Sequence, residues 1–419
     1  MAKNIDKMQF TNSKKRDNWE QIKLKDIAVK RNKKNKDSSI STVFSNSALN
    51  GIVEQKDFFA KKIANKDNLS SYFIVEKDDF VYNPRISSMA PCGPIHRNNT
   101  NKTGLVSPLY TVFRMDPKKC SLDYFEQYFK SSCWHKYMYS IANYGARSDR
   151  MNITDSDFFN MEIDAPQLIE QEKISSILTI WDKAIELKEK LIEQKKQQKK
   201  GLMQKLLTGE VRLPGFEGEW KKVRLGKIGK TYNGLSGKKA EDFGEGKPYI
   251  PYKAIFDDSK IDINKFEYVR IEENEKQNIV KYGDIFFTTS SETPDEVGMS
   301  SVLLEDVNEV YLNSFCFGYR LNNFDTLIPE FAQFLFRSDS FRRSTFKLAQ
   351  GSTRFNISKN EMMKITVLLP SIEEQKAIAE VLSNADREIK LLKKQVNFLK
   401  EQKKGLMQLL LTGKVRVKV

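Results

Sequence analysis

Hydroxyl and guanidinium groups are concentrated in two short segments of the second half of the chain. Hydroxyls at the end of a strand can contact phosphates or base edges. A guanidinium can also bind either group, because its donors form a planar fork. Such side chains indicate nucleic-acid contacts, and ordinary turn chemistry is the alternative. The residues are Thr288, Thr289, Ser290 and Ser291 in the first segment and Ser352, Thr353 and Arg354 in the second.

The first half of the chain carries a related set. The element G-x(2–4)-R-x-N-I-[ST] occurs at residues 145–154 and again at 351–358. A flexible glycine beside an arginine permits close backbone approach to a phosphate. A turn in which the asparagine caps a helix explains the element equally well.

The other candidate DNA contacts are Arg85, Ser87, Ser88, Lys102, Tyr144, Arg147, Arg150, Lys238, Lys239 and Lys253.

No reaction centre accompanies these residues. GKIGKT at 226–231 has too short a spacer between its glycines for a phosphate-binding loop, and no G-x-G-x-x-G opens a βαβ unit. NPR at 83–85 departs at its third position from an Asn-Pro-Pro-Tyr amino-methyltransferase motif. The four cysteines share no C-x-x-C spacing and only two histidines are present, so no metal site is expected. We therefore expect a binding protein without catalytic residues.

The composition also points to a nucleic-acid partner. The net charge is +15 and the isoelectric point is near 9.3. Lys and Arg neutralise phosphates and supply most nonspecific affinity for nucleic acid, although a merely basic surface is the alternative. A disordered chain is excluded, because 39% of the residues are hydrophobic and 11% aromatic. No apolar run is long enough to span a bilayer and MAKNIDKMQF lacks a signal-peptide core, so a cytoplasmic location and no membrane partner are expected.

The elements that position these residues come from an internal repeat. QKKGLMQKLLTG at 198–209 returns as QKKGLMQLLLTG at 402–413. Around the first copy, Pro166, Gln171 and Ile174 each have an identical residue 204 positions later. Such a repeat predicts two copies of one unit, each with a globular part followed by a long helix.

Both helices carry a heptad-like apolar seam and therefore need a packing partner. The seam residues are Ile174, Leu178, Trp181, Ile185, Ile192 and Leu202 in the first copy, and Ile378, Leu382, Ala385, Ile389, Leu392, Val396, Leu399 and Leu406 in the second. Lys188, Lys195 and Lys199 interrupt the first seam, and Lys403 interrupts the second. An antiparallel pair of the two helices is expected, and a homodimeric coiled coil is the alternative. Each helix should begin after a proline and end before Gly209 or Gly413.

The predicted fold class is α+β: two mixed α/β domains joined by two long helices in an antiparallel coiled coil, with pseudo-twofold internal symmetry. The motifs LKDI at 24–27 and LGKI at 225–228 are predicted as strands that open the two domains. The expected segments are a basic arm at 1–17, a first domain at 18–165, a first helix at 166–209, a second domain at 210–369, a second helix at 370–413 and a tail at 414–419 that packs near the first domain.

The two copies of KKGLMQ-L-LTG, each at the end of a helix that opens with Pro-x(4)-Gln-x(2)-Ile, resemble the specificity subunit of type I restriction–modification systems. The resemblance covers nearly the whole chain, and SETPDEVG and QGSTRFNIS are among its most specific parts. In that family each variable region is a target recognition domain and each helix is a conserved spacer. The first half departs from the pattern, with YGARSDRMNIT in place of QGSTRFNIS.

This resemblance implies a subunit that binds double-stranded DNA and has no cofactor of its own. Each domain would read one half of a bipartite, asymmetric site, and the helices would set the gap and dock two modification subunits. Those subunits carry S-adenosylmethionine and methylate adenine. Restriction subunits, which use ATP and Mg²⁺, can add to that core.

Two other classes of protein match parts of the sequence. A DNA-binding regulator with two unlike modules would need no methyltransferase partner. A coiled-coil adaptor for proteins alone would leave the positive charge and the divergence of the loops unexplained.

Overall fold

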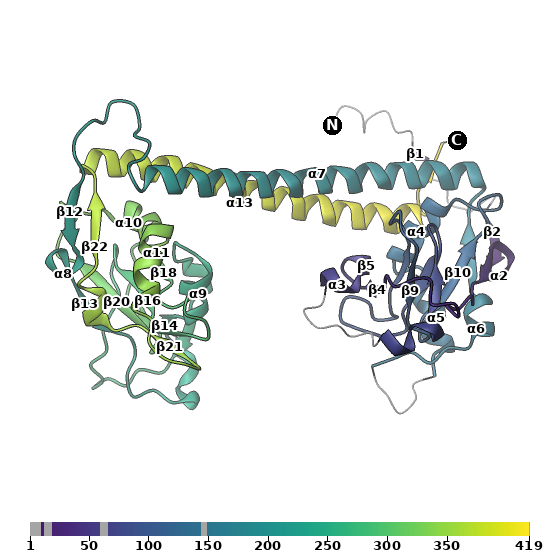
Figure 1. The fold of residues 1–419 in the computed structure, drawn as a ribbon, viewed down its shortest axis with the longest axis horizontal. Coiled ribbons are helices and arrows are strands. Elements are labelled where there is room, and N and C mark those ends of the chain that lie inside the picture. Colours follow the sequence, from purple (N-terminus) through teal and green to yellow (C-terminus); the bar gives the residue numbers. More distant parts are fainter. Residues whose placement is uncertain (1–9, 12–18, 59–65, 144–148, 419) are drawn as a thin grey trace. The chain divides into compact units, whose positions relative to one another are not determined.

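A computed structural model describes residues 10–11, 19–58, 66–143 and 149–418. The chain divides into two compact units, of which unit 1 contains residues 1–188 and 395–419 and unit 2 contains residues 189–394. Two long helices, α7 (Leu168–Leu206) and α13 (Ile372–Leu410), contribute residues to both units (Figure 1).

Unit 1 is built on a four-stranded antiparallel sheet in the order β3-β10-β7-β8. Phe80 of β7 and Phe113 of β10 stack across it at 5.5 Å, and both rings meet Phe129 of α4 edge-on. Its strands are β1 (Phe10–Thr11), β2 (Glu20–Lys23), β3 (Ala28–Lys30), β4 (Phe44–Ser47), β5 (Gly51–Glu54), β6 (Phe73–Val75), β7 (Phe80–Tyr82), β8 (Ile95–Arg97), β9 (Gly104–Val106), β10 (Thr111–Met115), β11 (Glu162–Ala165) and β23 (Arg416–Val417). Its helices, besides parts of α7 and α13, are α2 (Leu24–Ile27), α3 (Gln55–Phe58), η1 (Lys66–Ser71), α4 (Leu122–Lys130), α5 (His135–Ile141) and α6 (Asp155–Phe159).

Unit 2 repeats this plan with the antiparallel sheet β13-β20-β16-β18. A second sheet, β15-β14-β19, belongs to unit 2 only. The strands are β12 (Lys221–Arg224), β13 (Gly229–Asn233), β14 (Phe243–Ile250), β15 (Glu267–Val269), β16 (Ile285–Thr288), β17 (Ser290–Ser291), β18 (Ser300–Val302), β19 (Tyr311–Leu312), β20 (Cys316–Leu321), β21 (Phe355–Asn356) and β22 (Thr366–Leu369). The helices are α8 (Leu225–Ile228), η2 (Ala240–Asp242), α9 (Tyr252–Asp257), η3 (Ile263–Lys265), α10 (Pro329–Leu335), α11 (Asp339–Phe346) and α12 (Lys359–Met362).

The prediction of strands at LKDI and LGKI is wrong. Both motifs form a single helical turn, α2 or α8, and the strand is the segment before it, β2 or β12. Leu24 and Ile27 are both buried, because positions i and i+3 share one face of a helical turn. Strand β2 pairs with β11 and β12 pairs with β22, so in each repeat the strand before the helical turn pairs with the strand that leads into the long helix.

The two long helices pack antiparallel in each unit. In unit 1 the Nζ of Lys188 donates to Gln395 Oε1 at 2.7 Å. In unit 2 Lys195 lies 2.8 Å from Glu388, so higher numbers on one helix meet lower numbers on the other. This arrangement confirms the predicted fold class. The three lysines that interrupt the first seam, Lys188, Lys195 and Lys199, each contact an acceptor on the other helix. Buried seam residues are Ile174, Leu178, Ile185, Ile192, Ile378, Leu382, Ile389 and Val396, whereas Trp181, Leu202, Ala385, Leu392, Leu399 and Leu406 are half-buried.

Both helices stop as their sequences predict. Helix α7 is followed by Gly209 with φ +73° and α13 by Gly413 with φ +67°, values that favour glycine. After α13, β23 pairs antiparallel with β1, with Val417 opposite Phe10.

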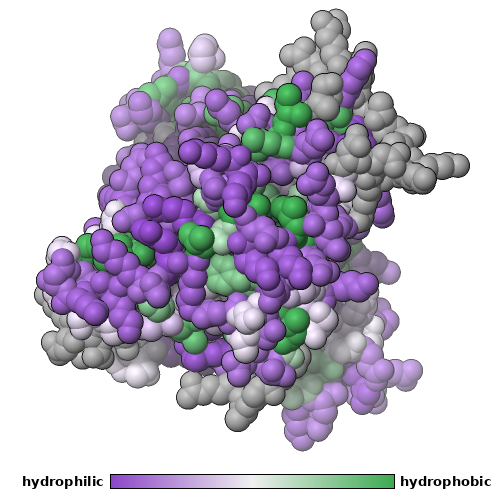
Figure 2. Space-filling model, turned by 90° about the vertical axis from the view of Figure 1, so that its right-hand side faces the viewer, coloured by the Kyte–Doolittle hydropathy of each residue, from purple (hydrophilic) through white to green (hydrophobic). Residues whose placement is uncertain are grey.

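The surface of unit 1 is mainly hydrophilic on the face that Figure 2 shows, where hydrophobic residues form small separate groups. Among the described residues, none of the helices combines the length and the apolar character needed to cross a bilayer.

Candidate nucleic-acid interface

Unit 2 brings together the two hydroxyl-rich segments, which residues 292–351 separate in the sequence. Strand β17 pairs antiparallel with β21, with Ser290 opposite Asn356 and Ser291 opposite Phe355. Gln350 and Asn356 also exchange backbone hydrogen bonds at 2.9 and 2.8 Å, so the residues between them form a closed loop. Ser352, Thr353 and Arg354 are exposed on this loop.

Gly351 is needed for the loop to close. Its φ of +132° is rarely adopted by residues with a side chain. A Cβ at this position would overlap the backbone carbonyl oxygen of Arg354. The shape of the loop tip, and with it the direction of the Arg354 side chain, therefore depends on glycine.

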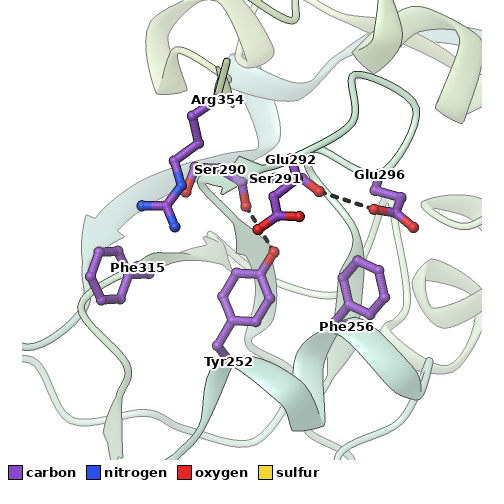
Figure 3. Close-up of a pocket in the computed structure, with 8 residues that line it drawn as sticks. All are labelled: Tyr252, Phe256, Ser290, Ser291, Glu292, Glu296, Phe315 and Arg354. Atoms are coloured by element: carbon purple, nitrogen blue, oxygen red, sulfur yellow. Dashed lines mark hydrogen bonds between the residues drawn. The ribbon is translucent and has the colours of Figure 1, made fainter.

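A pocket of about 380 Å³ lies between these segments and helix α9 (Figure 3). Its lining residues are Tyr252, Phe256, Ser290, Ser291, Glu292, Glu296, Phe315 and Arg354. In Figure 3, Arg354 and Phe315 form one side, Phe256 and Glu296 form the other, and Tyr252 stands between them. The pocket therefore combines aromatic faces, carboxylates and a guanidinium, a mixture that can bind an apolar ring with polar edges.

Hydrogen bonds fix the floor of the pocket. The hydroxyl of Tyr252 donates to the Ser290 carbonyl oxygen at 2.8 Å, and the Tyr252 ring stacks on Phe256 with centroids 6.1 Å apart. Burial raises the pKa of Tyr252, so this hydroxyl stays protonated at neutral pH. Glu296 accepts from Ser291 Oγ at 3.2 Å and from Thr293 Oγ1 at 2.8 Å.

Two of the hydroxyls in the 288–291 run are used inside the protein. Thr288 is fully buried, and its Oγ1 accepts from the backbone N–H of Met299 at 3.0 Å. Ser291 is also buried and donates to Glu296. Thr289 and Ser290 are half-buried. The backbone N–H of Thr289 donates to the Phe315 carbonyl oxygen, and the Thr289 carbonyl oxygen accepts from the Ile357 N–H. These contacts hold the pocket together, which leaves Thr289 and Ser290 as the accessible hydroxyls of the run.

The predicted lysines differ in what surrounds them. Lys238 is nearly buried and lies 2.5 Å from Glu275, so the protein itself already neutralises its charge. Lys102 is paired with Glu54 in unit 1. Lys239 and Lys253 are exposed, and Lys253 follows Tyr252 directly on α9.

Unit 1 has the same arrangement in outline. The backbone of Arg85 forms an isolated antiparallel β-bridge with that of Arg150. Asn143 and Asn152 form another, as Gln350 and Asn356 do in unit 2. Arg85, Ser87 and Ser88 are exposed, and the Ser87 hydroxyl accepts from the Ala90 N–H. Tyr144 and Arg147 lie outside the described residues.

Each central sheet is anchored by an equivalent ion pair. Arg114 Nε lies 2.7 Å from the fully buried Asp79 in unit 1, and Arg320 Nε lies 2.7 Å from the fully buried Asp284 in unit 2. Burial raises the pKa of Asp79, while the hydrogen bond from Arg114 opposes that shift. Each arginine is thus paired with an aspartate that directly precedes a central strand, β7 or β16.

Five pocket residues were not among those predicted from the sequence: Tyr252, Phe256, Glu292, Glu296 and Phe315. Only Glu292 and Glu296 carried a local signal, because they follow the hydroxyl run within SETPDEVG. Among the described residues, no group of three or more His, Cys, Asp or Glu side chains is placed to hold a metal ion.

Comparison with known proteins now decides the family. The family model for the "Type I restriction modification DNA specificity domain" matches residues 16–197 and again residues 217–401. The chain belongs to this family. Specificity subunits are the non-catalytic component of type I complexes, so membership confirms both the resemblance and the expectation of a non-catalytic subunit.

Individual relatives agree with the family. The chain is 31% identical over 277 residues to the type I restriction enzyme MjaVIII specificity subunit of Methanocaldococcus jannaschii. That match covers 62% of this chain and 64% of the relative, slightly less than two thirds of its length. The solved S subunit of the type I system of M. genitalium matches in fold with a TM-score of 0.52 and 15% identity, over 95% of this chain and 97% of that one. A chain from a structure of complex assembly and conformational transition in a type I R-M system gives a TM-score of 0.59 and 16% identity, over 94% and 97% of the two chains.

Proposed function

We propose that the chain is the DNA-specificity subunit of a type I restriction–modification enzyme and that each unit reads one half of a bipartite, asymmetric site. The duplicated arrangement carries the proposal. In each unit, the segment after one central strand pairs through its backbone with the segment that carries the R-x-N-I element. That strand is β7 in unit 1 and β16 in unit 2. The loops around this shared frame differ between the units, as expected for modules that read different short sequences.

The recognition domains span residues 18–165 and 210–369 in this proposal, and the spacers span 166–209 and 370–413. DNA approaches the exposed members of the predicted set, and base contacts add to phosphate contacts there. These residues are Arg85, Ser87, Ser88, Lys102, Lys239, Lys253, Ser352, Thr353 and Arg354, together with the half-buried Arg150, Thr289 and Ser290.

The two spacer helices also bind the modification subunits. Large apolar side chains remain exposed on both: Ile180 and Leu187 on α7 and Leu391 and Phe398 on α13 are each more than half exposed. Apolar residues of this size, repeated along a helix, favour a protein partner. The partners supply the chemistry, S-adenosylmethionine in the modification subunits and ATP with Mg²⁺ in any restriction subunits, and the complex works on cytoplasmic DNA.

Sequencing of methylated adenines in the native host tests this function. Deletion of the gene should remove one bipartite methylation motif from the genome, and the intact gene should restore it. A DNA-binding regulator without methyltransferase partners would leave every methylation motif in place. That result would overturn the proposal.

A further inference from the structure

The pocket in unit 2 has a chemical bias that the general role of DNA binding does not explain. Glu292 is exposed and lines the same pocket as Arg354, while the neighbouring Glu296 is occupied by two hydroxyl donors. A carboxylate on a DNA-facing surface is repelled by the phosphates. It is compatible with binding where it accepts a hydrogen bond from the exocyclic amino group of a base.

Phe315 supplies an apolar surface at the same place. Its side chain is 59% exposed, although it directly precedes the buried start of β20. Its backbone carbonyl accepts from the Thr289 N–H at 2.9 Å, so the residue is held against the hydroxyl segment. A rigid, exposed ring beside an arginine gives an apolar surface for the edge of a base in the major groove.

Arg354 has the opposite chemistry to Glu292. Its guanidinium is a donor only and enters the pocket from the Gly351 loop (Figure 3). It can hold a phosphate or a guanine edge while Glu292 faces the amino group of the adjacent base. The acceptor and the donor therefore lie on separate segments. Glu292 directly follows β17, and Arg354 lies on the closed loop between Gln350 and Asn356.

Resting on the proposed function, we infer that this pocket reads a base that presents an exocyclic amino group in the major groove, cytosine or adenine, in the half-site of the second domain. Glu292 accepts from that amino group, and Phe315 packs against the base. Thymine is rejected, because it presents an oxygen acceptor and a methyl group to the carboxylate. The size of the pocket, about 380 Å³, falls within the range of small-ligand sites.

The test is methylation mapping in the native host with variants of the full-length chain. Glu292→Gln keeps the shape of the side chain but replaces the carboxylate with an amide that can also donate. We expect the preference for the amino-bearing base to fall about tenfold at one position of one half-site, with the other half unchanged. Glu273→Gln removes the same charge from an exposed site of unit 2 outside the pocket and should leave the motif unchanged.

Phe315→Ala is the second variant and should lower methylation at the whole site about tenfold without changing its letters, because an apolar contact to the DNA is lost. Both Glu292 and Phe315 are exposed, so amide hydrogen exchange of both variants should match that of the wild type. A Glu292→Gln motif identical to the wild-type motif, or relaxed at every position, would overturn the inference. Such results differ from failure of the proposed function, in which the wild-type gene specifies no motif at all.

Discussion

The ammonium of Lys403 on α13 lies 2.6 Å from Oδ1 of Asp182 on α7 and also donates to Oε1 of Gln127 on α4 at 3.1 Å. Burial lowers the pKa of Lys403, and the hydrogen bond to Asp182 opposes that shift. One lysine thus connects both long helices with the recognition domain of unit 1. Unit 2 has a related contact, in which Lys199 lies 2.6 Å from Asp386.

Lys403→Met should loosen this connection. Asp182 keeps 42% of its side chain exposed, so water replaces part of the lost interaction, and we expect unit 1 to lose about 1–2 kcal/mol of stability. Hydrogen exchange should become faster around residues 175–185 and 398–408. Lys199→Met is the matched control and should affect unit 2 instead. Faster exchange in both units from either variant would contradict this assignment.

Arg416→Ala should be more damaging, because it leaves a buried carboxylate without its partner. Arg416 donates to Glu170 from Nε at 2.7 Å and from Nη2 at 2.6 Å, and Glu170 is only 2% exposed. We expect a loss of about 3–5 kcal/mol in unit 1, measured by urea unfolding with a unit-specific probe.

Arg212 forms the equivalent pair with Glu374 in unit 2 and provides the comparison for Arg416. Arg212→Ala should destabilise unit 2 and leave unit 1 unchanged. Arg416→Ala with Glu170→Gln should recover part of the stability, because a neutral amide is easier to bury than a charge. No recovery in this double variant would show that the bidentate pair is not the source of the loss.

Gly351→Ala should disturb the closed loop between Gln350 and Asn356 without unfolding unit 2. The positive φ and the overlap with the Arg354 carbonyl predict a local cost of about 1–3 kcal/mol. Methylation of the specified site should fall, and the thermal transition of unit 2 should move down by roughly 2–10 °C and stay cooperative. Gly201→Ala is the control for stability: it lies inside α7 with open space around it, and it should stabilise the helix by about 0.5–1 kcal/mol, opposite in sign to Gly351→Ala.

His96 should make unit 1 sensitive to mild acid. Burial lowers the pKa of His96 to about 4, below the value near 6.5 that it has in an unfolded chain. Between these values the unfolded chain binds a proton that the folded chain does not, so stability is retained above pH 6.5 and falls as the pH drops towards 4. His96→Gln should flatten urea-unfolding stability between pH 7.5 and 5.

His135→Gln is the comparison for His96→Gln, because burial lowers the pKa of His135 as well and it should contribute to the same slope. An unchanged slope in the His96 variant would contradict the buried neutral form.

The long helices were predictable because a periodic pattern is a local signal. Ile174, Leu178, Ile378 and Leu382 are all buried as the heptad spacing requires. The turn at LKDI was mispredicted because a motif of four residues is too short to distinguish a strand from one helical turn. Burial of Leu24 in the core decided between them, and that is a tertiary effect.

The pocket was only partly predictable. Ser290 and Arg354 have recognisable chemistry in the sequence, whereas Tyr252 and Phe315 join them only through the pairing of distant segments. Lys238 is a different case: its positive charge is visible in the sequence, but its pairing with Glu275 and its nearly buried side chain are not. Charge and residue type identify candidates, but their partners depend on contacts between residues far apart in the chain.

A domain exchange tests the central claim that the two units read separate halves of one site. Residues 18–165 should be replaced by the first recognition domain of another specificity subunit, and methylated adenines should be sequenced in the native host. One half of the motif should change while the other half and the gap stay the same. A change in both halves, or in neither, would contradict it.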